Sequence, residues 1–307
     1  MKAMDEEQLG LRAPLGAIVL GLLACTLVFN PFATPYDDSF FFKRVALHAL
    51  HGAGFSWNVG EGPVYGLTSQ LFALCATILT WLFPHYFVLA SKVFSAACLV
   101  WFADLLGRWA ARAGLSAYDA ALLLGFTCMT PLTLLAVQTG METTLCLALV
   151  ALTLSITLNG ATSASHGPIC AVLTALVYTC RPDAALIPAL AFLFTERKTL
   201  VALRYVVVLG ALLGLLLLAF RLYYGSALPL PFYAKSPGFS AFDGELRAAG
   251  LHDKFEHLCT FALFGAPLAY IGGHGRERRG WALLGTSAIF VLYQALVTNE
   301  IMGYLAR

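Results

Sequence analysis

Two adjacent carboxylates stand where they could take a proton in a reaction. Asp37 and Asp38 directly follow the first apolar segment of the chain. Neighbouring residues cannot share one face of a helix, so we expect them to differ in role. One would point into a cavity as a base, while the other caps the following helix at its N-terminus, where the helix dipole favours negative charge. The alternative is that both carboxylates are caps.

Other ionisable residues of both signs recur at the ends of apolar segments. They include Asp37, Asp38, Lys43, Arg44, Glu61, Glu142, Arg181, Asp183, Lys235 and Glu300. An ionisable side chain at the centre of a membrane helix costs about 2.5–3.5 kcal/mol on insertion scales. A set of both signs at one boundary therefore indicates a polar site there. The alternative is that these charges only end the spans.

The composition places the elements that hold these residues in a membrane. The chain has 307 residues, of which 59% are apolar and 12% are charged, whereas soluble domains carry about 25% charged residues. Its mean hydropathy is +0.77. A net charge of +2 gives no basic field for a nucleic acid. We predict an all-α, polytopic transmembrane helix bundle, and no soluble, disordered or disulfide-stapled domain.

Nine segments are apolar enough to be membrane spans, and residues 67–83 are apolar enough to be a tenth. Positive charge in the short loops decides between the two topologies, because the basic clusters would scatter over both sides if 67–83 crossed. Residues 67–83 are predicted to lie in the interface, because the short basic loops then fall on one side together with the N-terminus. That side is predicted to be cytoplasmic. The expected spans are 13–30, 86–106, 117–137, 143–159, 168–180, 184–195, 200–222, 257–273 and 281–298.

Two long outer loops, 31–66 and 223–256, carry most of the candidate residues. In the first, apolar and basic residues after Asp38 predict an amphipathic helix on the membrane, ended by Gly52 and Gly54. In the second, three prolines exclude a continuous helix. We predict one transmembrane domain over residues 1–307.

No metal site is indicated by the spacing of the possible ligands. His48 and His51 lie three residues apart, and residues 252–257 offer ligands at helical spacing, but neither group has a third ligand in register. None of the eight cysteines forms a CxxC pair, so they are interpreted as small hydrophobic residues in helix packing. A divalent cation at the tandem aspartates is possible.

Four motif segments in series resemble the integral-membrane glycosyltransferases of the GT-C fold, and among them the mycobacterial arabinofuranosyltransferase branch. The resemblance covers residues 36 to 235. Its segments are Tyr36–Phe40 with Arg44, Gly54–Glu61, Val64 and Gly66–Ser69; Gly140–Thr143; Arg181–Asp183; and Tyr223–Gly225 with Leu228–Pro229 and Phe232–Lys235.

The chain departs from this family at several positions. Tyr65 stands where an acidic residue is usual, and Leu67 and Ser69 replace a common aromatic residue and asparagine. Leu230 stands where asparagine is frequent. The sequence ends at Arg307, where relatives continue into further spans and often a soluble domain, so we expect either a minimal member or a fragment.

The resemblance implies transfer of a sugar from a polyprenyl-phosphate donor to a cell-envelope glycan or lipid acceptor, with inversion, at the outer face of a bacterial-type inner membrane. It implies that Asp37 or Asp38 is the base. The donor phosphate and sugar would be held by Arg44, Glu142, Arg181, Tyr233 and Lys235. Glu142 would bind sugar hydroxyls or orient the base, whereas Asp183 would pair with Arg181. No cofactor is firmly predicted.

Two other classes of protein compete with a transferase. A transporter or flippase of a lipid-linked or small polar substrate predicts charges within spans and broken helices at matched positions; only Lys92 lies well inside a predicted span. An inactive, truncated scaffold is the third interpretation.

Overall fold

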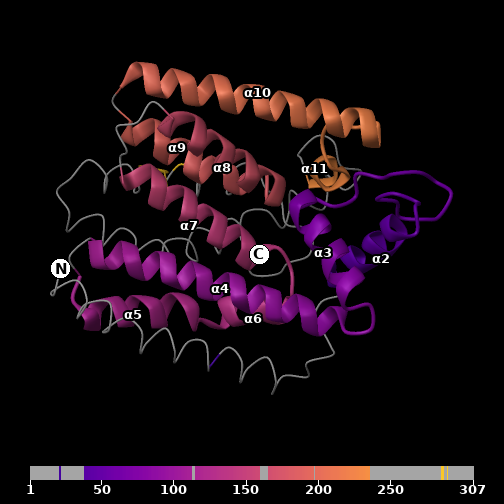
Figure 1. The fold of residues 1–307 in the computed structure, drawn as a ribbon, viewed down its shortest axis with the longest axis horizontal. Coiled ribbons are helices and arrows are strands. Elements are labelled where there is room, and N and C mark those ends of the chain that lie inside the picture. Colours follow the sequence, from indigo (N-terminus) through magenta and orange to yellow (C-terminus); the bar gives the residue numbers. More distant parts are fainter. Residues whose placement is uncertain are drawn as a thin grey trace, which may run out of the picture. The chain divides into compact units, whose positions relative to one another are not determined.

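Every regular element that the computed structural model describes is a helix (Figure 1). The described residues are 21, 38–112, 115–159, 165–196, 198–235, 285–286 and 289. The elements are α2 (Asp38–Leu50), α3 (Gln70–Leu82), α4 (Phe87–Arg112), α5 (Ala117–Cys128), α6 (Pro131–Thr139), α7 (Thr143–Asn159), α8 (His166–Cys180), the 3₁₀ turn η1 (Asp183–Ala185), α9 (Leu186–Thr195), α10 (Thr199–Tyr224) and α11 (Leu230–Lys235). The prediction of an all-α fold is confirmed for these residues.

The chain divides into two compact units that exchange short segments. The first unit contains residues 1–64, 69–155 and 179–181, and the second contains residues 65–68, 156–178 and 182–307. The single transmembrane domain over residues 1–307 stays a prediction.

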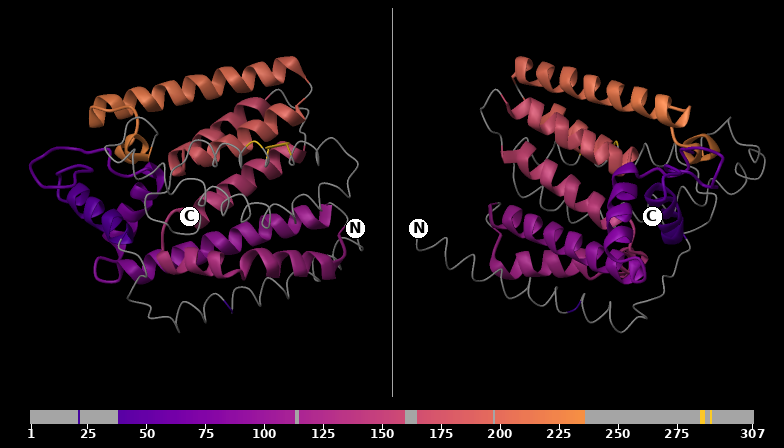
Figure 2. Two further views of the ribbon diagram at one scale, coloured as in Figure 1. Left: turned by 180° about the vertical axis from the view of Figure 1, so that it is seen from behind. Right: turned by 45° about the vertical axis from the view of Figure 1, so that its right-hand side comes forward.

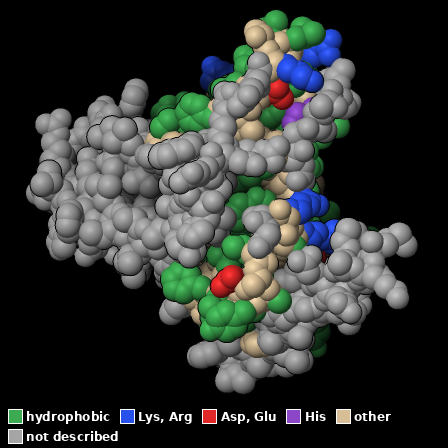
Figure 3. Space-filling view, turned by 90° about the vertical axis from the view of Figure 1, so that its left-hand side faces the viewer, with side chains coloured by type: hydrophobic (Ala, Val, Ile, Leu, Met, Phe, Trp, Pro, Cys, Tyr) green, Lys and Arg blue, Asp and Glu red, His purple; other side chains and the backbone are tan. Residues whose placement is uncertain are grey.

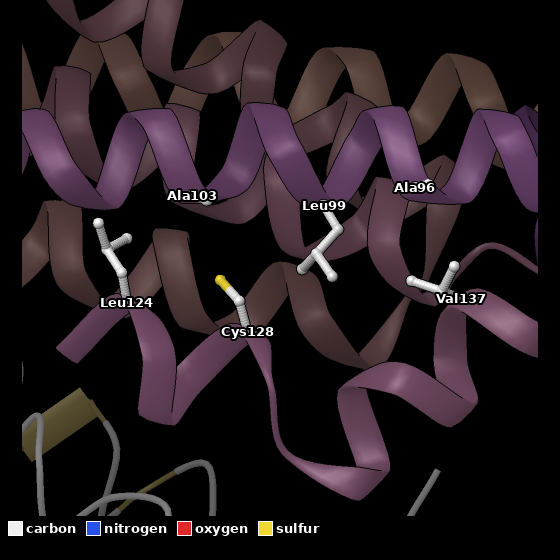
Figure 4. Packing of buried hydrophobic residues seen from close by; sticks show 6 residues of the cluster. All are labelled: Ala96, Leu99, Ala103, Leu124, Cys128 and Val137. Atoms are coloured by element: carbon white, nitrogen blue, oxygen red, sulfur yellow. The ribbon is translucent and has the colours of Figure 1, made fainter. Parts of the chain in front are cut away.

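The core of the first unit is the packing of α4 against α5 and α6. Leu99 and Ala103 of α4 are fully buried against Leu124 and Cys128 of α5, while Val137 of α6 closes the cluster (Figure 4). The buried face of α4 is rich in small residues, namely Ser91, Ser95, Ala96, Ala103, Gly107 and Ala110. Small side chains let helices approach closely, and this is the usual packing of helices in membranes.

A break divides the predicted span 117–137 into α5 and α6, which together are still long and apolar enough to be one bent span. The two helices meet at an angle of 49°. Thr130 has extended backbone angles and its Oγ1 accepts a hydrogen bond from the backbone N–H of Thr133 at 3.2 Å. Pro131 lacks an N–H and disfavours helical angles in the residue before it, which explains the break.

The predicted amphipathic helix of the first loop is present as α2. Gly52 and Gly54, the two residues expected to end it, both have positive φ, +82° and +67°. Its buried face packs on α3, where the rings of Phe42 and Phe72 meet edge to face with centroids 4.8 Å apart. The position of α2 on a membrane surface stays a prediction.

In the second unit, α8, α9 and α10 lie side by side in both views of Figure 2. Phe192 of α9 stacks on Tyr205 of α10 at 4.1 Å, and the Tyr205 hydroxyl lies 3.1 Å from Thr174 Oγ1 of α8. The backbone of α10 also approaches Gly167 of α8 closely. Most other side chains of α10 face outward.

Two of the described helices, α4 and α10, are long and apolar enough to cross a bilayer, and the bent pair of α5 and α6 would make a third. The apolar helices α3, α7, α8 and η1 with α9 are shorter. Predicted spans 143–159, 168–180 and 184–195 thus occur as helices but fall short by length. Spans 13–30, 257–273 and 281–298 lie almost wholly outside the described residues.

Basic side chains lie near the end of α4 and the start of α10, and the prediction that both ends face the cytoplasm stays a prediction. Arg108 and Arg112 occupy the last turns of α4, while Lys198 and Arg204 flank the start of α10. On the face seen in Figure 3, basic side chains in blue lie among hydrophobic side chains in green.

Candidate functional site

The candidate base at residue 38 begins a helix. Asp38 is half-buried and occupies the first turn of α2, a position in which the helix dipole favours a carboxylate. Asp37 lies outside the described residues. The division of roles between the two carboxylates therefore stays a prediction, and the position of Asp38 fits the capping role in it.

Arg44, the first candidate for the donor phosphate, stabilises the loop that follows α2. Its Nε donates a hydrogen bond to the carbonyl of Trp57 and its Nη2 donates to Asn58 Oδ1, each at 3.0 Å. The guanidinium also lies over the Trp57 ring, 4.7 Å from its centroid. Asn58 Nδ2 in turn donates to Glu61 Oε2 at 2.8 Å. The exposed guanidinium thus orders residues 57–61.

His48 helps to order the same loop from the next turn of α2. Its Nδ1 lies 3.0 Å from the carbonyl oxygen of the fully buried Ser56. Among the described residues, no three His, Cys, Asp or Glu side chains gather as metal ligands would. Residues 252–257 lie outside the described ranges. A divalent cation at Asp37 and Asp38 stays a prediction, and no step below depends on it.

Glu142 lies in the tight turn between α6 and α7, and only 7% of the residue is exposed. Gly140 makes this turn possible, because it ends α6 with a left-handed conformation at φ +62°. The carbonyl of Met141 accepts a hydrogen bond from Ser95 Oγ of α4 at 3.2 Å. The carbonyl of Glu142 accepts from the backbone N–H of Cys146 at 2.8 Å. The turn is thus fixed from both sides.

Three of the four motif segments meet at Cys180, the last residue of α8. Its Sγ lies 3.8 Å from the carbonyl of Glu142, and Ser69 Oγ lies 4.0 Å from that sulfur. Ser69 also caps α3, because its Oγ accepts from the backbone N–H of Phe72 at 3.3 Å. Arg181, which is half-buried, follows Cys180 directly. Three motif segments therefore share one region of the first unit, namely the first-loop segment at Ser69, Gly140–Thr143 and the segment that begins at Arg181.

The fourth motif segment belongs to the second unit, where it packs on Tyr65. The buried ring of Tyr65 stacks on Tyr224 at 4.8 Å, and the Tyr65 carbonyl accepts a hydrogen bond from the backbone N–H of Leu230 at 2.8 Å. Burial raises the pKa of the Tyr65 hydroxyl, and the neighbouring Tyr178 and Tyr224 raise it further. Tyr65 and Leu230, two positions that depart from the family pattern, are thus in contact.

Tyr233 and Lys235 lie on α11, in the second unit. The Tyr233 ring is partly exposed and packs edge to face on Phe232 at 5.9 Å. Lys235 is the last residue of α11, and its side chain lies outside what is described. Their proposed contact with the donor stays a prediction.

Sequence reasoning missed several polar residues around the Glu142 turn. Cys180 was interpreted as a packing residue, yet its sulfur contacts the Glu142 carbonyl. Ser95 lies in an apolar helix and gives no motif signal. Lys92 could be singled out from the sequence, because an ionisable side chain within a membrane span is costly and usually has a functional role or a charged partner.

No known protein family, curated protein or solved structure matches the chain. The resemblance to GT-C enzymes therefore rests on the motif residues alone.

Proposed function

We propose that the chain is a membrane glycosyltransferase that moves a sugar from a polyprenyl-phosphate donor to a cell-envelope glycan or lipid acceptor. The observation that carries the proposal is the meeting of three motif segments through Ser69, Cys180 and Glu142. Ser69 and Cys180 are 111 residues apart in sequence. Motif segments that are distant in sequence but adjacent in space favour a shared site. Charges that only ended separate spans would not need to lie together.

In the proposed reaction, the acceptor oxygen bonds to the anomeric carbon while the bond from that carbon to the phosphate oxygen breaks. Asp37 or Asp38 takes the proton of the acceptor hydroxyl. Arg44, Arg181 and Lys235 stabilise the phosphate that leaves with the bonding electrons. One displacement inverts the anomeric configuration, whereas a double displacement would need a carboxylate nucleophile.

Two further residues would position the sugar. Glu142 would accept hydrogen bonds from sugar hydroxyls or orient the base, and the ring of Tyr233 would stack on the sugar or bond to it. The enzyme would need no resident cofactor for this reaction, although a divalent cation at the aspartates would add a second means of holding phosphate. Its partners are the lipid-linked donor, the acceptor and membrane lipids.

The proposed setting is a bacterial-type inner membrane, with nine spans, a cytoplasmic N-terminus and the site on the outer face. The apolar helices and the basic residues at the end of α4 and the start of α10 support it. Asp38, Glu142 and Arg181 would then lie at the outer ends of their helices.

The decisive experiment uses the purified full chain in proteoliposomes with a radiolabelled polyprenyl-phosphate arabinofuranose, followed by hexose donors. We expect transfer to an oligosaccharide acceptor, and a loss of about 10²–10⁴-fold in at least one of Asp37→Asn and Asp38→Asn. Asp104→Asn is the matched control, because Asp104 is half-exposed and its Oδ2 pairs with Arg108 Nη2 at 2.8 Å away from the motif segments. Full activity in both test variants would remove the first-loop acids from the mechanism.

A transporter or flippase is the second candidate, and two observations favour it. Lys92 is buried within a helix that could span the membrane, and α5 and α6 form a bent pair. The same vesicles separate the two functions: a transferase makes a new glycosidic bond, whereas a flippase moves the intact labelled lipid to the other leaflet.

A further inference from the structure

Lys92 is a buried cation on the packed face of α4, whose other buried residues are uncharged. Only 1% of the residue is exposed, and it lies in the second turn of the 26-residue α4. A charged group removed from water needs a compensating charge or hydrogen bonds, since burial alone costs several kcal/mol per ion. The fold must therefore provide acceptors for this ammonium group.

The segment that packs against Lys92 is the turn that carries Glu142. A Cβ atom built on Gly140 would lie 3.2 Å from the backbone nitrogen of Lys92, so the two backbones are in close contact. One turn further along α4, Ser95 Oγ donates to the carbonyl of Met141. Residues three apart share a helix face, so Lys92 and Ser95 face the same turn. Glu142 is the next residue and is buried as well.

The other described acids of the first unit have other surroundings. Asp104 pairs with Arg108 near the far end of α4, and Asp119 accepts a hydrogen bond from Ser116 Oγ at 2.7 Å. Glu61 is exposed and bonded to Asn58. Asp38 begins α2. Among the described acids of this unit, Glu142 is thus the one whose backbone segment contacts that of Lys92.

We propose that Lys92 is a positioning residue whose ammonium group compensates the buried Glu142 carboxylate and holds it as a hydrogen-bond acceptor for sugar hydroxyls. This inference rests on the proposed transferase function. An ionised carboxylate only accepts hydrogen bonds, whereas a protonated one also donates. Arg181 is the other cation near this turn, but it is less buried than Lys92 and can keep contact with water.

The first readout is thermal unfolding of the purified full chain, which does not depend on the proposed activity. Lys92→Met and Glu142→Gln are each expected to lower the midpoint by about 5–10 °C. The double variant should unfold closer to the wild type than Lys92→Met does. Lys43→Met, a half-buried lysine of α2, is the control and should show no such coupling with Glu142→Gln.

The second readout is sugar transfer per folded molecule. Lys92→Met should lower kcat/KM at least tenfold, Lys92→Arg should recover most of the loss, and Lys92→Met should add little to the defect of Glu142→Gln. A purely structural lysine would leave transfer per folded molecule unchanged. If Lys92→Met does not accumulate in cells, accumulation of the double variant becomes the readout, and its failure overturns the pairing.

The two proposals fail separately. If the wild-type chain transfers no sugar but the unfolding data show the coupling between Lys92 and Glu142, the transferase proposal is wrong and the charge pair stands. If the wild-type chain transfers sugar but shows no coupling between Lys92 and Glu142, the charge pair is wrong and the transferase proposal stands. The same holds if Lys92 is coupled to Asp38 instead, or Glu142 to Arg181.

Discussion

At the scale of single residues, Arg44 has a structural task that its motif position did not reveal. Its guanidinium binds the Trp57 carbonyl and Asn58 Oδ1 and covers the Trp57 ring. Only a planar fork can make these three contacts at once. A donor phosphate would therefore meet an arginine that is already oriented by the loop.

Arg44→Lys keeps the charge and loses the fork, so residues 57–61 should open more often. Two exposed hydrogen bonds and a cation–π contact together stabilise the loop by about 1–2 kcal/mol, which corresponds to a roughly 5–30-fold fall in protection. Hydrogen exchange of the loop amides measures this. Lys43→Met is the control, because Lys43 forms no hydrogen bond or ion pair with the described residues. Equal exchange in both variants would contradict the structural role of Arg44.

Gly140 gives a second prediction at this scale. Its φ of +62° is unfavourable for alanine, and an added Cβ would lie 2.6 Å from Ser91 Oγ and 3.2 Å from the backbone of Lys92. Gly225 is the matched control, because it has φ +75° and nothing within 4 Å of an added Cβ. Each alanine should cost about 1–2 kcal/mol for the left-handed backbone. Gly140→Ala should cost about 1–3 kcal/mol more, from overpacking.

The midpoint of chemical unfolding of each purified variant tests this difference. Equal losses at Gly140 and Gly225 would mean that α4 yields to the added methyl group, and that the turn bearing Glu142 is not held as tightly as its contacts indicate.

At the scale of elements, hydropathy predicted where helices occur better than where they break. The predicted segment 143–159 and α7 have the same ends, because Asn159 and Gly140–Glu142 interrupt the apolar run on both sides. The segment 117–137 was predicted as one span, and its apolar composition gave no sign of a break within it. The extended backbone of Thr130, imposed by Pro131, breaks the helix, and hydropathy averaged over a window does not report backbone geometry.

The contact between α8 and α10 depends on one glycine. An added Cβ on Gly167 would lie 2.7 Å from the carbonyl oxygen of Val201 and 3.3 Å from the backbone nitrogen of Tyr205. Because both neighbours are backbone atoms, the helices must separate, and Gly167→Ala should lower the free energy of unfolding by about 1–3 kcal/mol. Thermal unfolding in detergent measures the loss.

Gly214→Ala is the control within the same pair of helices. Nothing lies within 4 Å of a Cβ added there, and Gly214 is interior to α10. Alanine should therefore stabilise the helix by about 1 kcal/mol. A loss at Gly214 similar to that at Gly167 would point to a general intolerance of α10 rather than to close packing.

At the scale of the whole molecule, the sequence indicated which polar residues belong together but not what holds them. The motif order placed Glu142 and Arg181 in one site, and the Cys180 contact brings their segments together. Ser69 was part of a motif segment and Lys92 stood out as a charge within a predicted span, whereas Ser95 gave no signal. The contacts of Ser69 and Ser95 with segments distant in sequence could not be predicted. The stacking of Tyr65 on Tyr224 could not be predicted either, although Tyr224 was part of a motif and Tyr65 was a departure from one.

The number of membrane spans depends on whether α3 crosses the bilayer. Its 13 residues span about 20 Å, less than the roughly 30 Å hydrocarbon core, so α3 should lie in the interface. Only α4 then crosses between Val59 and Tyr118, which are 74% and 71% exposed. In intact cells, a membrane-impermeant maleimide should label Val59→Cys at once and Tyr118→Cys only after permeabilisation. Five of the six described native cysteines are buried and should react little. Labelling of both variants from outside would mean that α3 crosses as well and that the nine-span topology is wrong.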